Sequence, residues 1–143
     1  MLPHEHHDLT RGVDLIHDAA CDVGQVPSVM TALAIRDIVS WFEFQLRPHL
    51  AWEESWLYPR IERFTGTPWS TRAARFDHSQ LIAALERVQA EELEALHGMG
   101  TERQAAIRCR LFALEALVRA HLELEERLLL PILSEAGADP SGR

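Results

Sequence analysis

Two stretches of the sequence place histidine and glutamate at a spacing that suits a bound metal ion. Residues 49–59 read HLAWEESWLYP and residues 121–131 read HLELEERLLLP, so the two copies share 6 of 11 positions. On a helix, residues four apart lie on one face about a turn apart. His49 with Glu53, and His121 with Glu125, therefore each direct an imidazole and a carboxylate towards one point. These two ligand types together suit iron, manganese or zinc.

The same spacing of the two copies relates two isolated histidines. His6 and His78 stand 72 residues apart, and each is followed 43 residues later by one of the H-x-x-x-E pairs. A repeat at a fixed lag indicates that a chain is built from similar structural units. We therefore predict two tandem helical hairpins, each with one lone histidine and one histidine-glutamate pair.

The predicted turns place these histidines at one level. In an antiparallel hairpin, two residues share a level when the turn lies near the midpoint of the sequence between them. The midpoints for the three consecutive pairs of histidines fall beside Pro27, just before Gly66, and within 98–100. We therefore predict a single metal-binding layer inside a helical bundle. Its members are His6, His49, Glu53, His78, His121 and Glu125.

The remaining histidines are expected to lie outside this layer. His17 fails the midpoint test against His49, and it follows His6 by eleven residues, about 16 Å along a helix axis. We interpret it as a packed or surface residue. His7 is an alternative to His6, because the first helix begins too close by for its rotation to be set. His4, His7 and His97 lie near predicted helix ends, where histidine is ordinarily solvated or caps the helix.

Apolar residues recur at helical spacing through four segments that are separated by short turns. They predict helices near residues 8–22, 28–64, 68–97 and 101–136, with no competing strand pattern. Pro48 and Pro59 are expected to bend the second helix, or to break it near its end. The sequence therefore predicts an all-α protein, an up-down-up-down four-helix bundle. We expect one domain, residues 1–143, with the bundle over about 4–136 and a frayed tail over 137–143.

Composition and charge narrow the possible functions. The net charge of −8 and the lack of Lys/Arg runs argue against nucleic acid or an anionic membrane surface as a partner. No stretch approaches the roughly 18 apolar residues of a membrane span, and no run resembles a signal peptide, so we expect a cytoplasmic protein. Cys21 and Cys109 lie within helical patterns, and we expect both thiols to be buried and unreactive.

Residues beside the two motifs have other expected roles. Glu54 and Glu126 recur in both copies, but each lies about 100° around the helix from the preceding glutamate. This direction favours surface positions or salt bridges between helices. Trp52 and Trp56 are expected to fill the core or its edge, and Trp56 is also placed to cover the site.

The full arrangement resembles the hemerythrin-like domain, also called the HHE cation-binding domain. The resemblance rests on the order of a lone His, H-x-x-x-E, a second lone His and a second H-x-x-x-E, with proline six residues after each glutamate, over about residues 4–136. It implies a non-haem di-iron centre that binds and reacts with dioxygen, hydrogen peroxide or nitric oxide. The six residues of the layer are then the iron ligands, with both glutamates bridging. Manganese and zinc are less favoured.

The chain differs from the oxygen-carrying hemerythrins in two features. The carriers have H-x-x-x-H on the third helix, whereas here Ala74 and Ile82 stand four residues on either side of His78. Their last motif also ends in aspartate, one residue later than Glu125. The chain therefore resembles the branch with four histidines and two glutamates. We expect it to handle an oxidant or nitric oxide, with reversible oxygen or iron binding, or sensing, as the alternative; the role of Tyr58 stays open.

Overall fold

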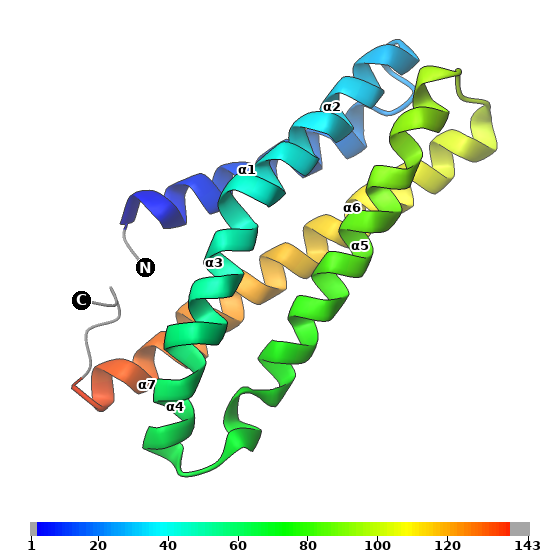
Figure 1. Cartoon of the computed structure of the whole chain (residues 1–143). Helices are drawn as coiled ribbons and strands as arrows, with labels where there is room; N and C mark the ends of the chain where they lie inside the picture. The colour runs from blue at the N-terminus through cyan, green and yellow to red at the C-terminus, as the bar shows by residue number, and fades with distance from the viewer. Residues whose placement is uncertain (1–2, 138–143) are drawn as a thin grey trace.

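Nearly all of the described chain is helical, as Figure 1 shows. The computed structural model describes residues 3–137, and side chains from His7 onward; within this part no strand is present. The first helical rod is α1 (Pro3–Asp22), and the third is η3 (Pro68–Thr71) with α5 (Arg72–Leu96). The second rod joins α2 (Ser28–Trp41), η1 (Phe42–Leu46), α3 (Arg47–Trp52), η2 (Glu53–Leu57) and α4 (Tyr58–Thr65). The fourth joins α6 (Thr101–Leu124), η4 (Glu125–Leu129) and α7 (Leu130–Glu135).

Each rod packs against its neighbours in the chain. Helix α1 packs on α2 and on α6, while α5 packs on the same two helices, so the four rods surround a common interior. This arrangement is consistent with the predicted four-helix bundle. In Figure 1, α4 and α7 extend past the first residues of α1, so three rods surround that end of the molecule. The predicted helix limits agree with the observed ones within a few residues, except that α1 begins at Pro3. The predicted frayed tail lies outside the described residues apart from Gly137.

The apolar interior is divided into two clusters of buried side chains. The larger one lies among α1, α2, η1, α3, α5 and α6, and includes Leu9, Ile16, Ile35, Phe42 and Leu111. The smaller one lies at the end that α1 does not cover, and includes Leu57, Tyr58, Ile61, Leu129 and Leu133. On the segments that carry both clusters, five further side chains are buried: His49, Glu53, His78, His121 and Glu125.

Prolines do not break the second rod, contrary to one expectation from the sequence. Pro48, Pro59 and Pro131 each follow a π-helical turn and stand second in the α-helix that comes next. In each π turn, the amide after the turn bonds to the carbonyl five residues back; that of Tyr58 bonds to Glu53. A proline has no amide hydrogen and clashes with the carbonyl four residues before it in an α-helix. The wider π turn keeps the rod continuous by absorbing this misfit.

A glycine lets α1 approach the second rod closely. Gly12 is buried against the indole of Trp41, and a Cβ atom on Gly12 would overlap that ring. The indole Nε1–H of Trp41 donates a hydrogen bond to the backbone carbonyl of Asp8, with a length of 3.2 Å. Gly12 and Trp41 therefore set the spacing between the first and second rods.

Both cysteines are exposed, so the expectation of buried thiols was wrong. Cys21 directly follows the buried Ala20, and Cys109 stands two residues from both Ile107 and Leu111, which are buried. At about 100° per residue, each thiol therefore points away from the apolar face of its helix. In the part of the chain that the structure describes, no helix has the length and apolar character needed to cross a membrane.

Candidate metal centre

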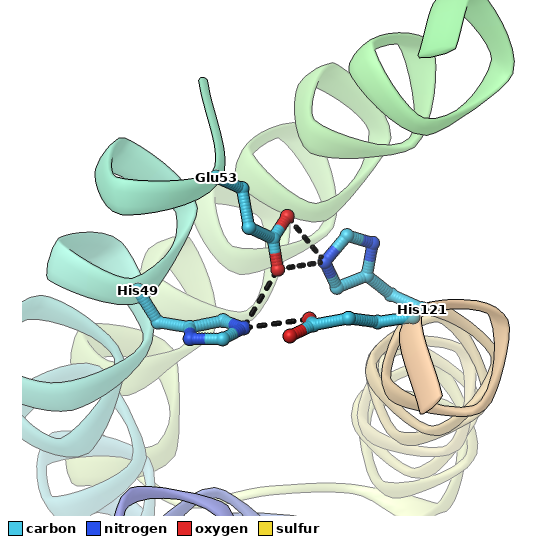
Figure 2. A group of neighbouring side chains, drawn as sticks. His49, Glu53 and His121 are labelled. Atoms are coloured by element: carbon cyan, nitrogen blue, oxygen red, sulfur yellow. Dashed lines mark hydrogen bonds and ion pairs between the residues drawn. The ribbon is translucent and has the colours of Figure 1, made fainter. Parts of the chain in front are cut away.

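Five of the six predicted ligands lie together in one buried layer. His49 belongs to α3, Glu53 to η2, His78 to α5, His121 to α6 and Glu125 to η4. Their exposed fractions are 8%, 0%, 3%, 1% and 1%, so all five are buried. Figure 2 shows His49, Glu53 and His121 pointing towards one another in the space between the helices. Three rods therefore bring imidazoles and carboxylates to a common interior point.

The carboxylate of Glu53 lies at the centre of this layer. Its Oε1 is 2.6 Å from Nε2 of His49, and its Oε2 is 2.7 Å from Nε2 of His78. The Nε2 atom of His121 lies 3.0 Å from both oxygens. One carboxylate thus contacts three imidazoles, and its two oxygens face different histidines.

Glu125 completes a compact group of ligand atoms. Its Oε2 lies 2.7 Å from Nε2 of His49. Ligand atoms of His49, Glu53, His121 and Glu125 all lie within 4.8 Å of one another. The second oxygen of Glu125, Oε1, is buried and has no hydrogen-bond partner among the described residues. An unpaired buried oxygen costs about 1–3 kcal/mol, so a cation at this point would supply a partner that the protein itself does not.

The charges in the layer are strongly coupled. Burial disfavours the charged imidazole of His49, but hydrogen bonds to Glu125 and Glu53 outweigh burial and raise its pKa to about 9. Burial alone would raise the pKa of Glu53, but hydrogen bonds from His121, His49 and His78 hold it well below its usual range. Burial, with the Glu53 charge nearby, raises the pKa of Glu125 to about 8. Two buried carboxylates thus share His49 as a cationic partner, an arrangement that a metal cation would relieve.

Tyr58, whose role the sequence left open, is also a member of the layer. Its hydroxyl donates a hydrogen bond of 2.7 Å to Oε2 of Glu53 and lies 2.9 Å from Nε2 of His78. Burial and the Glu53 charge raise the pKa of the phenol, so Tyr58 stays protonated. In an uninterrupted α-helix, Tyr58 would point about 140° away from Glu53. The π turn η2 brings it inward, and only the proline after it hinted at such a turn.

Glu54 and Trp52 support the histidines from outside. The Nδ1–H of His78 donates a hydrogen bond of 2.7 Å to Oε1 of Glu54, whose side chain is 49% exposed. This confirms the expected contact of Glu54 between helices, and it orients His78 so that Nε2 faces Glu53. The indole of Trp52 stacks on His49, with ring centroids 5.7 Å apart. Trp56, the residue predicted to cover the site, stacks on Trp52 instead.

The other histidines are placed as follows. The side chains of His4 and His6 lie outside the described residues, so the predicted role of His6 as a ligand stays a prediction. His7, the alternative to His6, is exposed. His17 is on the surface beside Glu115, as expected. The exposed His97 lies near the end of α5, and its Nδ1 lies 2.8 Å from the carbonyl oxygen of Leu93.

A helical bundle that directs buried histidines and glutamates from three rods to one point has the architecture of a cation-binding protein. Residues 1–133 match the family model of the hemerythrin HHE cation-binding domain, and the chain belongs to this family. The match confirms the family that the doubled H-x-x-x-E motif indicated. A search of the curated proteins and a search of the solved structures found no match.

Proposed function

We propose that the protein holds two iron ions in this layer. The proposed ligands are His6, His49, Glu53, His78, His121 and Glu125. The main support is the position of Glu53, because one of its oxygens faces His49 and the other faces His78. A carboxylate that faces two sets of ligands would be able to hold two metal ions. The unpaired Oε1 of Glu125 is a second oxygen available to such a pair.

Iron is the metal that the family favours, and the donor set accepts it. Imidazole and carboxylate donors accept iron, manganese or zinc, and the two thiols are exposed and outside the layer. A di-iron centre supplies electrons and open coordination positions to small oxidants and to nitric oxide. We therefore propose that the protein reacts with dioxygen, hydrogen peroxide or nitric oxide as a small-molecule ligand in the cytoplasm, without nucleic acid or membrane as a partner.

The residues around the layer would control what reaches it. Leu46, Leu81 and Val118 are no more than 1% exposed and belong to the apolar cluster on one side. Such a lining excludes water and charged solutes, and it favours small uncharged molecules such as hydrogen peroxide or nitric oxide. Tyr58 keeps a protonated hydroxyl at Glu53 and His78, where it orients both groups.

Consumption of an oxidant, rather than its transport, is the function that we propose. The position four residues before His78 is Ala74, which is buried in the same apolar cluster as Tyr58. A small side chain there leaves room for the Tyr58 ring, whose centroid lies 5.4 Å from that of His78. The oxygen carriers have a second histidine four residues from the one on the third helix, whereas neither Ala74 nor Ile82 is a metal ligand. We therefore place the chain in the branch with four histidines and two glutamates, and we propose that this branch consumes an oxidant instead of carrying it.

Metal analysis, followed by a cycle of air and deoxygenation, tests this proposal. The iron-loaded, reduced protein is mixed with air, and the dioxygen is then stripped. We expect about two iron ions per chain, no full return of the reduced optical spectrum, and decay of added hydrogen peroxide at a rate proportional to protein. Full and repeatable return of the reduced spectrum would indicate a reversible oxygen binder. A colourless protein that purifies with zinc would indicate a metal-stabilised structural bundle.

A further inference from the structure

A second cluster of chemically reactive side chains lies on the outer surface, between α1 and α6. The Sγ atom of Cys21 lies 3.5 Å from Nε2 of His17, one turn earlier in α1. The other ring nitrogen of His17, Nδ1, lies 3.1 Å from both oxygens of Glu115 in α6. A thiol, an imidazole and a carboxylate are thus connected in series, in the order of nucleophile, base and orienting group.

The imidazole in this cluster is held in a defined orientation. Glu115 is only 8% exposed, and Arg119 donates a hydrogen bond of 2.8 Å to its Oε1. The ring of Phe112 meets the His17 ring edge-on, with centroids 5.8 Å apart. Because a carboxylate only accepts hydrogen bonds, Nδ1 of His17 carries the proton that faces Glu115. Nε2 is then free to accept the thiol proton of Cys21.

We propose that Cys21 is a reactive thiol that forms mixed disulfides with small disulfide molecules, with His17 as its base and Glu115 as the positioning residue. This site is separate from the metal layer, since Glu115 precedes His121 by six residues, about 9 Å along α6. The proposal therefore does not depend on the proposed reaction at the metal centre.

The reaction that we propose is a thiol-disulfide exchange. His17 accepts the proton of the Cys21 thiol, and the sulfur attacks one sulfur of the small disulfide. A new S–S bond forms, the original S–S bond breaks, and the other half leaves as a thiolate that takes the proton from His17. One disulfide and one thiol are consumed and one of each is produced, so no further oxidant is required.

The position of Cys21 in its helix makes His17 the deciding group. Cys21 is the next-to-last residue of α1, where the end of the helix presents backbone carbonyls and no free amide to its sulfur. Cys109 is also exposed, but it lies within α6, and among the described residues no side chain forms a hydrogen bond with its thiol. Without a base, Cys21 should therefore react no faster than Cys109. The second cysteine is a matched control within the same chain.

The test compares the two cysteines in the full, metal-loaded protein. Cys109→Ser leaves Cys21 as the only thiol, and Cys21→Ser leaves Cys109. Each variant is mixed at pH 7 with 4,4′-dithiodipyridine, whose released thione is followed by absorbance, and with oxidised glutathione, whose adduct is located by peptide mass spectrometry. We expect Cys21 to react at least roughly tenfold faster than Cys109, a modest effect for a positioned base.

Variants of the base and of its positioning residue complete the test. In the Cys109→Ser background, His17→Ala should bring the rate down to that of Cys109 or below, and added imidazole should restore part of it. Glu115→Gln should give an intermediate rate. Helix content and metal content should not change, because the cluster lies outside the metal layer. Equal rates for the two cysteines, or no effect of His17→Ala, would overturn the proposal even if the metal centre reacts as proposed.

Discussion

Tyr58 and Glu53 meet across a π-helical turn, where the Tyr58 hydroxyl donates a hydrogen bond of 2.7 Å to Oε2 of the carboxylate five residues earlier. The backbone amide of Tyr58 bonds to the carbonyl of the same glutamate, so side chain and main chain span the same turn. The equivalent residue in the second repeat is Leu130, which has no hydroxyl. The two halves of the metal layer therefore differ at this point.

Removing this hydroxyl should weaken the fold without removing a ligand. We expect Tyr58→Phe to lower the free energy of unfolding of the metal-free protein by about 1 kcal/mol, because Glu53 loses one buried hydrogen bond. The number of metal ions bound per chain should stay at the wild-type value. Chemical denaturation and metal analysis measure the two quantities. If the variant bound one ion fewer, Tyr58 would have to be a ligand instead of a hydrogen-bond donor.

Removing a central imidazole should lower both the metal content and the folding stability. His49 contacts Glu53 at 2.6 Å and Glu125 at 2.7 Å, and His49→Ala leaves both buried carboxylates without this partner. We expect most of the bound metal to be lost, and the metal-free protein to be destabilised by about 3 kcal/mol or more. Elemental analysis and thermal denaturation would show this. The control His17→Ala should keep the wild-type metal content, and its loss there would contradict the assignment of the layer.

The carboxylate that orients His78 should tune metal affinity. Glu54→Gln weakens the hydrogen bond of 2.7 Å to Nδ1 of His78 but leaves the proposed ligands in place. We expect metal affinity to fall by about 10–100-fold, with the same number of ions bound at saturation. Competition with a chelator measures the affinity. Glu43→Gln is a matched control, since Glu43 bonds only to Arg47 on the surface in the described structure; equal effects of the two changes would exclude a special role for Glu54.

Stability should depend on pH through Glu62, at the far end of the second rod. The hydrogen bond from Thr71 lowers the pKa of Glu62, and Arg75 adds to this against the effect of burial. A folded-state pKa below the unfolded value of 4.5 stabilises the fold above that pH, and this stabilisation is lost as the pH falls through the folded-state pKa. Glu62→Gln should therefore lower the free energy of unfolding by roughly 1 kcal/mol at pH 7, and by less below pH 4.5.

A double-mutant cycle identifies the partner of Glu62. Urea denaturation of metal-free protein, at several pH values, gives the free energy for the wild type, Glu62→Gln, Thr71→Val and the double variant. If the hydrogen bond from Thr71 is responsible, Glu62→Gln should have a smaller effect in the Thr71→Val background. Additive effects of the two changes would mean that other contacts lower the pKa.

Close packing of α1 on the second rod should make one glycine essential to stability. A Cβ atom at Gly12 would overlap the indole of Trp41, so we expect Gly12→Ala to destabilise the protein by about 1–3 kcal/mol. Gly100 has no atom within 4 Å of the corresponding Cβ position, and Gly100→Ala should change stability much less. Thermal denaturation compares the two variants. Similar melting temperatures would show that Trp41 moves aside without cost.

The amino-acid sequence alone determined the helical class, the turns and most of the proposed ligand layer. Helical periodicity is a local property, so it is visible directly along the chain. The 72-residue repeat carries tertiary information as well, because together with the turns it places His49, His78 and His121 at one level of the bundle. The structure brings these three imidazoles within 3.0 Å of the Glu53 carboxylate.

Only the tertiary structure decided which further side chains enter the layer and which surfaces meet. A π turn changes the direction of the side chains that follow it. A regular α-helix, with 100° per residue, would direct the Tyr58 side chain away from Glu53. The contact of His17 with Glu115 depends on how α1 and α6 face each other. The contact of Glu54 with His78 depends in the same way on how the second and third rods face each other. Such contacts join residues that are far apart in the sequence. They are set by the packing of whole helices, which no local pattern contains.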